Sequence, residues 1–309
     1  MPRVLDPSQI ESFADRDIPR IRLPDEAQVF ARRAARLKHW SASGARGHGA
    51  AIADYLRLMA VVAEAQQIAL AGLTVPPLAD EAIARARTHG MPVAQAAGLE
   101  RDPAWRAILM ELCEAALRTP RLPAGVDAVC GRLRDSLAPQ LEEHAEGVLT
   151  ARTLDVAAAP FVMSALQVYW VRLASRLSGA EVSPLDVPGI CPVCGTPPVA
   201  SVVRVDRGSS GHRYLHCALC ATEWHLVRVT CSQCLATQEL TYHWIEGGSE
   251  AVRAEACASC RGYRKILYQE KDMAVEPVAD DLASLALDLL MSAEGYHRAS
   301  GNPLLWQSP

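Results

Sequence analysis

Eight of the ten cysteines in this 309-residue chain lie in one stretch, where they form four Cys-x-x-Cys pairs. A gap of two residues lets both sulfurs of a pair point to one centre, and two pairs supply the four thiolates of a tetrahedral zinc or iron site. This stretch is therefore predicted to bind metal. The eight predicted ligands are Cys191, Cys194, Cys217, Cys220, Cys231, Cys234, Cys257 and Cys260.

The spacing of the pairs predicts two separate metal sites. Between Cys194 and Cys217 there are 22 residues, and there are also 22 between Cys234 and Cys257. Each cysteine of the first set has a counterpart 40 positions later, which indicates a tandem repeat of one four-cysteine module. We therefore expect two metal ions, each with its own set of four thiolates.

The residues after each pair leave the metal open between iron and zinc. Gly195 follows the first pair and suits a rubredoxin-type knuckle, in which backbone N–H groups turn towards sulfur. The other pairs are followed by Ala221, Leu235 and Arg261, so this iron-type signature is incomplete. Thiolate cages accept either metal. Either metal would supply about 10–16 kcal/mol of folding energy to a module too small to fold unaided.

The segments between the pairs have the sequence of β-hairpins. Residues 199–205 and 212–216 flank a turn at 207–211, and residues 240–245 and 251–255 flank a turn at 246–249. The hairpins would carry the cysteines at their ends. We therefore predict a first rubredoxin-like or zinc-ribbon-like module at residues 184–228 and a second at 229–270.

The remainder of the chain is predicted to be helical, so the expected fold class is α+β. Residues 1–183 are expected to form an all-α domain, which begins with a loose arm at 1–23 that has a short helical turn. Residues 271–309 form a C-terminal helix and tail that pack on the preceding domains. The helix from Pro277 would bury one face, made of Leu282, Leu285, Ala286, Leu289 and Ala293. The N-terminal helices are expected at 25–41, 52–71, 80–88, 103–117, a stretch ending near 137, 139–152 and 161–177.

Composition argues against several classes of partner. Residues 186–262 carry six Arg and Lys against seven Asp and Glu, so the ribbons lack the positive charge that nucleic-acid binding requires. The most apolar segment, 156–171, is shorter than the roughly 20 residues of a membrane span. The N-terminus lacks the apolar stretch of a secretion signal. We therefore expect a cytoplasmic protein. The cytoplasm keeps thiols reduced, so paired cysteines there indicate metal binding rather than disulfide bonds.

No motif in the sequence indicates an enzyme. The chain has no phosphate-binding glycine-rich loop, no His-Glu-x-x-His and no nucleophile elbow. The histidines of the ribbon region are expected at strand positions or in hydrogen bonds around the cysteines. Trp224 and Trp244 suit a small sheet core better than base stacking, and Cys113 and Cys130 are expected to be buried apolar residues. The histidines in question are His212, His216, His225 and His243.

Five motifs together resemble the FdhE family of formate dehydrogenase accessory proteins. They are residues 191–195 (CPVCG), 213–220 (RYLHCALC) continuing into 222–225 (TEWH), the second cysteine set from Cys231, 277–285 (PVADDLASL) and 301–305 (GNPLL). The motifs cover about the last 120 residues, and the N-terminal helices match only in general character. The resemblance implies a maturation protein that binds the catalytic subunit of respiratory formate dehydrogenase in the cytoplasm before export. It also implies rubredoxin-like iron at the eight cysteines.

Two other functions remain as alternatives. A rubredoxin-like protein that moves electrons to or from the formate dehydrogenase would use the same thiolates. A nucleic-acid-binding zinc ribbon would use the same hairpins, but the charge count disfavours it. The leading interpretation is an accessory protein that has no catalytic residues of its own.

Overall fold

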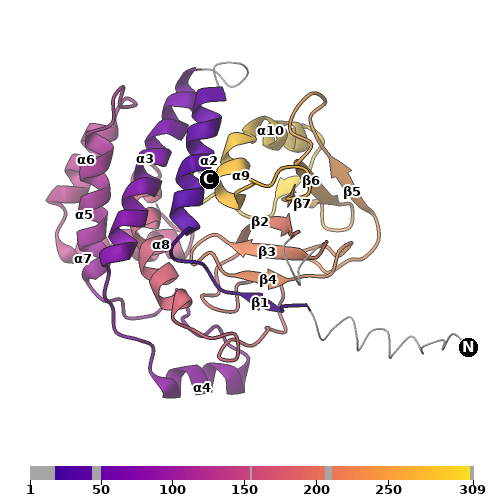
Figure 1. Ribbon diagram of the computed structural model, residues 1–309, viewed down its shortest axis with the longest axis horizontal. Helices are drawn as coiled ribbons and strands as arrows, with labels where there is room; N and C mark the ends of the chain where they lie inside the picture. Colours follow the sequence, from indigo (N-terminus) through magenta and orange to yellow (C-terminus); the bar gives the residue numbers. More distant parts are fainter. Residues whose placement is uncertain (1–17, 44–49, 154, 206–210, 307–309) are drawn as a thin grey trace, which may run out of the picture.

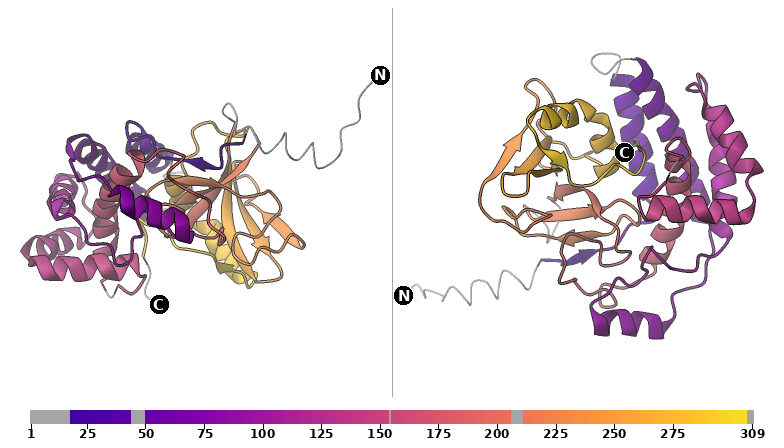
Figure 2. Two further views of the ribbon diagram at one scale, coloured as in Figure 1. Left: turned by 90° about the horizontal axis from the view of Figure 1, so that it is seen from below. Right: turned by 180° about the vertical axis from the view of Figure 1, so that it is seen from behind.

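The computed structural model describes residues 18–43, 50–153, 155–205 and 211–306 of the chain. The N-terminal helices form one side of the molecule, and a β-sheet with the C-terminal helices forms the other, as Figures 1 and 2 show from three directions. The predicted α+β class is confirmed, with a helical N-terminal region and two four-cysteine clusters in the C-terminal region. One hydrophobic core extends through both sides.

The helix α8 (Ala159–Ser175) lies at the centre of the helical side. Its side chains from Ala159 to Ala174 are buried, because α3, α5 and α7 pack against it. Pro160 is compatible with the helix because it occupies the first turn, where a backbone N–H has no helical partner. Within the described ranges, no helix is both long and apolar enough to cross a membrane. The other N-terminal helices are α2 (Val29–Ser43), α3 (Ala50–Gly72), α4 (Asp80–His89), α5 (Ala104–Leu117), α6 (Val126–Asp135) and α7 (Ala138–Leu149).

The described residues form one eight-stranded sheet, in which both cysteine modules take part. The strand order is β1-β4-β3-β2-β7-β6-β5, and β8 pairs with β7. Each module contributes an antiparallel unit, and the parallel pairing of β2 with β7 joins the two. The strands are β1 (Ile21–Arg22), β2 (Pro198–Val203), β3 (Arg213–Cys217), β4 (Glu223–His225), β5 (Leu240–His243), β6 (Val252–Cys257), β7 (Gly262–Tyr268) and β8 (His297–Arg298).

The N-terminal arm differs from the prediction. Residues 1–17 and the predicted turn at 207–211, apart from Gly211, lie outside the described residues. Ile21 and Arg22 form a strand that pairs with Trp224 and Glu223 of β4, where a loose arm or a helical turn was expected. A strand of two residues has no detectable period, and its partner lies about 200 residues away, so no local pattern predicts it.

The predicted C-terminal helix is two helices, α9 (Pro277–Ala283) and α10 (Leu285–Ala293). The hydroxyl of Ser284 donates to the carbonyl oxygens of Asp280 and Asp281, which competes with helix continuation. The break rotates the buried face, so Leu287 and Met291 are buried on α10. The predicted face is therefore wrong beyond the break: Leu285 is only partly buried, and Ala286, Leu289 and Ala293 are exposed.

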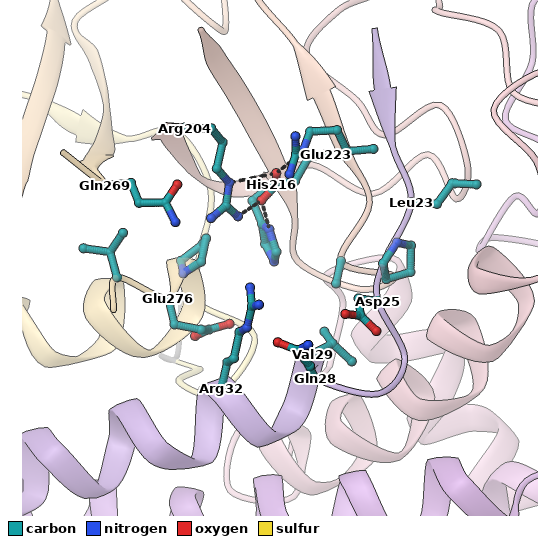
Figure 3. A pocket seen from close by; sticks show the side chains of 15 residues that line it. Leu23, Asp25, Gln28, Val29, Arg32, Arg204, His216, Glu223, Gln269 and Glu276 are labelled. Atoms are coloured by element: carbon teal, nitrogen blue, oxygen red, sulfur yellow. Dashed lines mark hydrogen bonds and ion pairs between the residues drawn. The ribbon is translucent and has the colours of Figure 1, made fainter. Parts of the chain in front are cut away.

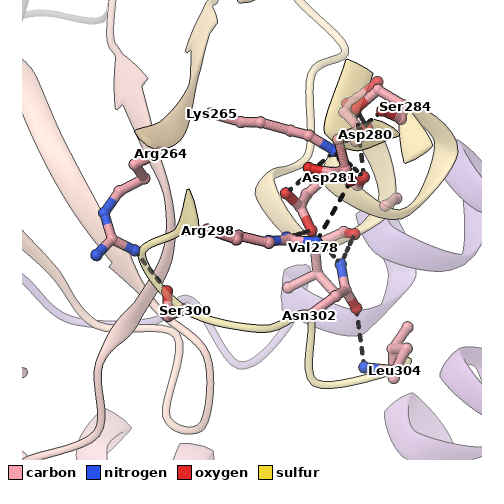
Figure 4. A network of polar contacts seen from close by, with 12 residues as sticks. Arg264, Lys265, Val278, Asp280, Asp281, Ser284, Arg298, Ser300, Asn302 and Leu304 are labelled. Carbon is pink, nitrogen blue, oxygen red and sulfur yellow. Dashed lines mark hydrogen bonds and ion pairs between the residues drawn. The ribbon is translucent and has the colours of Figure 1, made fainter. Parts of the chain in front are cut away.

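The helix α9 lies between α2 and the sheet, and buried charges hold it on both sides. Arg36 of α2 donates to Asp280 at 2.8 Å. On the sheet side, Lys265, Arg298 and Asn302 converge on the carboxylate of Asp281 (Figure 4). Burial opposes the charge on Asp281, but Lys265 and Arg298 lower the pKa of this carboxyl below its usual value. The C-terminal region is therefore integral to the fold.

Candidate metal centres

The first four-cysteine cluster lies where the helical side meets the sheet. It contains Cys191, Cys194, Cys217 and Cys220, all of which are buried. The Sγ atoms of Cys191 and Cys220 are 3.5 Å apart, and those of Cys194 and Cys217 are 3.3 Å apart. The backbone N–H of Leu219 points to the Cys217 sulfur at 3.3 Å. Such donors stabilise a thiolate in its charged form.

Segments of the helical side cover the first cluster. The backbone N–H of Ala94 donates to the carbonyl of Val193, between the first two cysteines, at 2.7 Å. On α8, Gln167 donates to the carbonyl of Ala218, between the other two, at 2.7 Å. Trp170 of α8 donates to the carbonyl of Ala94 at 2.9 Å, which fixes the covering strip to the helix. The first cluster is therefore part of the core shared by helices and sheet.

The second four-cysteine cluster lies at the end of the sheet and is open to solvent. Cys234 is exposed and Cys260 is partly exposed, whereas Cys231 and Cys257 are buried. The Sγ atoms of Cys231 and Cys260 are 3.7 Å apart, as are those of Cys234 and Cys257. The support behind this cluster comes from the C-terminal tail, where the carbonyl of Glu294 accepts from Arg261 at 2.8 Å.

All four Cys-x-x-Cys turns share one backbone conformation. The residue after the second cysteine has a positive φ in each: 77° at Gly195, 58° at Ala221, 63° at Leu235 and 57° at Arg261. Three non-glycine residues thus adopt the left-handed conformation that glycine adopts most easily. The absence of glycine therefore does not change the turn, and it does not distinguish an iron site from a zinc site.

The cysteines predicted from the sequence come together in the predicted two sets of four, and each set fits a tetrahedral metal ion. In each set the sulfur atoms all lie within 4.8 Å of one another. A metal–sulfur distance of 2.3 Å in a regular tetrahedron requires sulfurs about 3.8 Å apart. The separations of 3.7 Å in the second cluster are close to this value, and those in the first are slightly shorter.

Each cluster combines thiols that ionise easily with thiols that do not. Burial raises the pKa of Cys191 well above its ordinary value. Burial also opposes ionisation of Cys194, but hydrogen bonds from the neighbouring thiols lower its pKa well below that value. In the second cluster the pKa of Cys257 falls to about 7, and burial raises that of Cys260 to about 12. Metal binding would displace the remaining thiol protons.

A polar cavity of about 290 Å³ lies beside the first cluster, between α2 and strands β3 and β4 (Figure 3). In it, Glu223 accepts from Arg204 at 3.1 Å, and its carboxylate lies 3.0 Å from Nδ1 of His216. Burial opposes the charge on Glu223, but Arg204 and His216 lower the pKa of this carboxyl well below its usual value. His216 thus makes a hydrogen bond next to Cys217, and no described histidine joins either set of ligands.

The other histidines and the two tryptophans have structural contacts. His243 lies 2.8 Å from the hydroxyl of Thr241, and the rings of His212 and His225 contact each other. Trp224 is buried. Trp244 is 55% exposed and packs against the guanidinium of Arg253, so it is not part of the core.

Two cysteines outside the ribbons lie together, which the sequence did not indicate. Cys113 on α5 and Cys130 on α6 are buried, as predicted. Their thiols share a hydrogen bond that raises the pKa of Cys113 and lowers that of Cys130. The contact depends on how the two helices pack, so the spacing of the cysteines along the chain cannot reveal it.

Comparison with known proteins matches nearly the whole described chain to one family. Residues 18–186 match the N-terminal region of FdhE, residues 190–228 its central domain and residues 229–305 its C-terminal domain. This chain belongs to the FdhE family. The resemblance that the cysteine motifs indicated is therefore confirmed, and it extends over the helical side as well.

Individual relatives cover almost the full length of the chain. A protein named FdhE homolog from Cronobacter sakazakii is 40% identical and covers 98% of this chain and 97% of its own. A protein named FdhE from Salmonella paratyphi A is also 40% identical, over 94% of this chain and 92% of its own. The crystal structure of the FdhE protein from Pseudomonas aeruginosa has a TM-score of 0.81 and 37% identity, and it covers 93% of this chain and 99% of that one.

Proposed function

We propose that this protein is an accessory protein for the maturation of respiratory formate dehydrogenase. In this proposal it binds the catalytic subunit in the cytoplasm before export, and it performs no catalysis itself. The observation that carries the proposal is the pair of four-thiolate clusters within one sheet, in a chain of the FdhE family. The eight cysteines of the two clusters would hold two metal ions, iron in the rubredoxin-like form or zinc.

The role of the metals in this proposal is to keep the ribbons folded. Strands β2 and β7 join the modules, so an unfolded module would leave its neighbour with an unpaired strand. Exposed sheet edges can offer backbone hydrogen bonds to an extended partner. Strand β5 lies at one end of the sheet, far from the N-terminal helices, and would be accessible to a large client (Figure 1).

A complementation experiment tests the proposal. Cells that lack this protein should still make the formate dehydrogenase catalytic subunit but show little formate-dependent activity. The wild-type chain should restore activity and should capture the catalytic subunit in a pull-down. A variant with Cys217 and Cys220 replaced by serine should do neither. Full activity from a folded variant that lacks the first metal ion would refute the proposed role of that metal.

A redox role is the second candidate, because the second cluster is open to solvent. Cys234 is exposed, so a metal ion there would lie close enough to the surface for electron transfer to a partner. Iron in this cluster would give a visible absorption spectrum that bleaches on reduction. A colourless protein containing only zinc, with full maturation activity, would eliminate this candidate.

A further inference from the structure

A second cavity, of about 360 Å³, lies on the sheet face opposite α9. Lys265 of β7 points to α9, and because side chains alternate along a strand, Ile266 and Tyr268 point to the other face. There they line the cavity with side chains of β3, β5 and β6 and of the segment 228–229. We call this cavity the arginine cleft, after Arg228 and Arg253 in its walls.

The arginine cleft has an excess of positive charge. Its lining contains three arginines and a single carboxylate, Glu255. That carboxylate is already engaged, because it pairs with Arg213 at 2.7 Å and accepts from the hydroxyl of Tyr242 at 3.0 Å. Arg228 and Arg253 have no acidic partner in the part of the chain that the structure describes. Two positive charges therefore face the cleft.

Two aromatic rings hold the guanidinium of Arg253 in place, and one of its donors has no partner among the described residues. Its guanidinium lies over the rings of Trp244 and Tyr268, 5.1 Å from each centroid. Its Nε is buried and has no acceptor among the described residues. An unpaired buried donor is unfavourable, and a planar guanidinium fixed by aromatic rings matches a carboxylate with two parallel hydrogen bonds.

The surroundings of the cleft favour an extended polypeptide as the source of that carboxylate. Tyr242 lies on β5, whose outer edge pairs with no other strand in the described sheet. Trp244 and Val229 are 55% and 53% exposed beside the arginines. Aromatic and arginine side chains of this kind dominate the energetics of protein interfaces.

We propose that the arginine cleft binds an aspartate or glutamate side chain of a protein partner, in an extended segment laid along β5. This inference rests on the proposed function, since it describes how the client is recognised. The carboxylate would bind to Arg253, Arg228 would attract the acidic segment, and the edge of β5 would pair with its backbone.

The experiment uses the full-length, metal-loaded protein and fluorescein-labelled 15-residue peptides that tile the formate dehydrogenase catalytic subunit. Fluorescence anisotropy should identify an acidic peptide that binds. Arg253→Gln should weaken its binding about 10-fold to 100-fold, as expected for a charge-assisted hydrogen bond. Arg228→Gln should weaken it less. Arg85→Gln, an exposed arginine on α4, is the matched control and should leave binding unchanged.

The peptide itself supplies the second half of the test. Replacing its acidic residue by the corresponding amide should weaken binding to wild type and remove most of the difference between wild type and Arg253→Gln. Equal binding of acid and amide peptides would overturn the proposal. So would millimolar acetate that displaces the peptide completely, because the cleft would then accept any free carboxylate. Binding of oligo-dT that is lost in Arg253→Gln would assign the cleft to phosphate instead.

Two controls separate this inference from the proposed function. If wild type captures the whole catalytic subunit and Arg253→Gln captures it equally well, the cleft proposal fails and the proposed function stands. If wild type captures none, the proposed function fails. Arg253→Gln should keep both metal ions. Should that variant unfold, Arg253→Lys keeps the charge without the planar fork and should bind the peptide with intermediate affinity.

Discussion

The two four-cysteine clusters have the same spacing and the same turn conformation, yet they lie in opposite environments. The first is covered by α8 and by the strip around Ala94, and all four of its thiols are buried. The second lies at the free end of the sheet, with Cys234 exposed. The two copies of the motif therefore have different surroundings, because only the first copy packs against the N-terminal helices.

This difference indicates two different uses for the same ligand set. A metal ion in the first cluster would stabilise the junction of helices and sheet, and solvent would have no direct route to it. A metal ion in the second would stabilise mainly its own ribbon, and chelators, oxidants or partner proteins could reach it.

The largest expected effect is on global stability, from the matched changes Cys191→Ser and Cys231→Ser. Each should remove one metal ion, which elemental analysis will measure, and leave the other bound. Loss of the first metal withdraws up to about 10–16 kcal/mol from the shared core, so the helices and the sheet of Cys191→Ser should unfold together at a much lower temperature than in wild type. Cys231→Ser should leave the helical signal in circular dichroism nearly unchanged. Equal losses of helix would contradict the comparison.

A second change acts on the buried charges between α9 and the sheet, behind the second cluster. Asp281→Asn removes the buried carboxylate that pairs with Lys265 and Arg298 and leaves both cations with Asp288 alone, and breaking a buried ion pair costs up to about 3–5 kcal/mol. Arg298 of β8, which pairs with β7 next to Cys260, loses the same partner. Chemical denaturation should show the loss, and metal should leave the second cluster first. Asp272→Asn, at a partly exposed ion pair with Arg36, is the control and should cost less than about 1 kcal/mol.

The same carboxylate predicts a dependence of stability on pH. The pKa of Asp281 is lower in the folded protein than the value of about 3.9 for an unfolded chain. Its contribution is therefore complete above about pH 4 and is lost as the pH falls through the folded-state pKa. Between pH 5 and pH 3 the free energy of unfolding should fall more steeply in wild type than in Asp281→Asn. Parallel curves would show that this carboxylate has an ordinary pKa.

Exposure of the second cluster predicts biphasic release of metal. A chelator with a coloured metal complex should remove one equivalent at least about tenfold faster than the other, which corresponds to about 1.4 kcal/mol in activation free energy. The fast phase should disappear in Cys231→Ser and persist in Cys191→Ser if that variant remains folded. A fast phase that persists in Cys231→Ser would assign the labile metal to the buried cluster.

The smallest effect concerns the turns themselves. Leu235 is exposed and has a φ of 63°, so Leu235→Gly should relieve backbone strain and stabilise the protein by up to about 1 kcal/mol. Gly195 has a φ of 77°, and a Cβ there would lie 3.3 Å from Pro92, so Gly195→Ala should destabilise by a similar amount or more. Thermal melts will compare the two. If both changes stabilised the protein, or both destabilised it, the left-handed position would not favour glycine in both turns.

The features that the sequence predicted depend on short-range patterns. Cysteine spacing assigned all eight thiols to the right sets, and apolar periodicity located α3 and α8 to within a few residues. What escaped prediction depends on contacts between distant segments. These features are the pairing of β1 with β4, the break at Ser284, the helical segments that cover the first cluster, and the stacking of the Arg253 guanidinium on Trp244. No local period encodes which helix covers which ribbon, so the difference between the clusters was invisible.

The pairing of β1 with β4 has a consequence for folding during synthesis. Roughly 200 residues separate Ile21 from Trp224, and ribosomes add about 5–20 residues per second, so β1 waits roughly 10–40 s for its partner. Because β4 follows directly after Cys220, that partner forms only when the first module has folded. The N-terminal segment thus takes its place after the first metal-dependent step, and its pairing would report that this step has been completed.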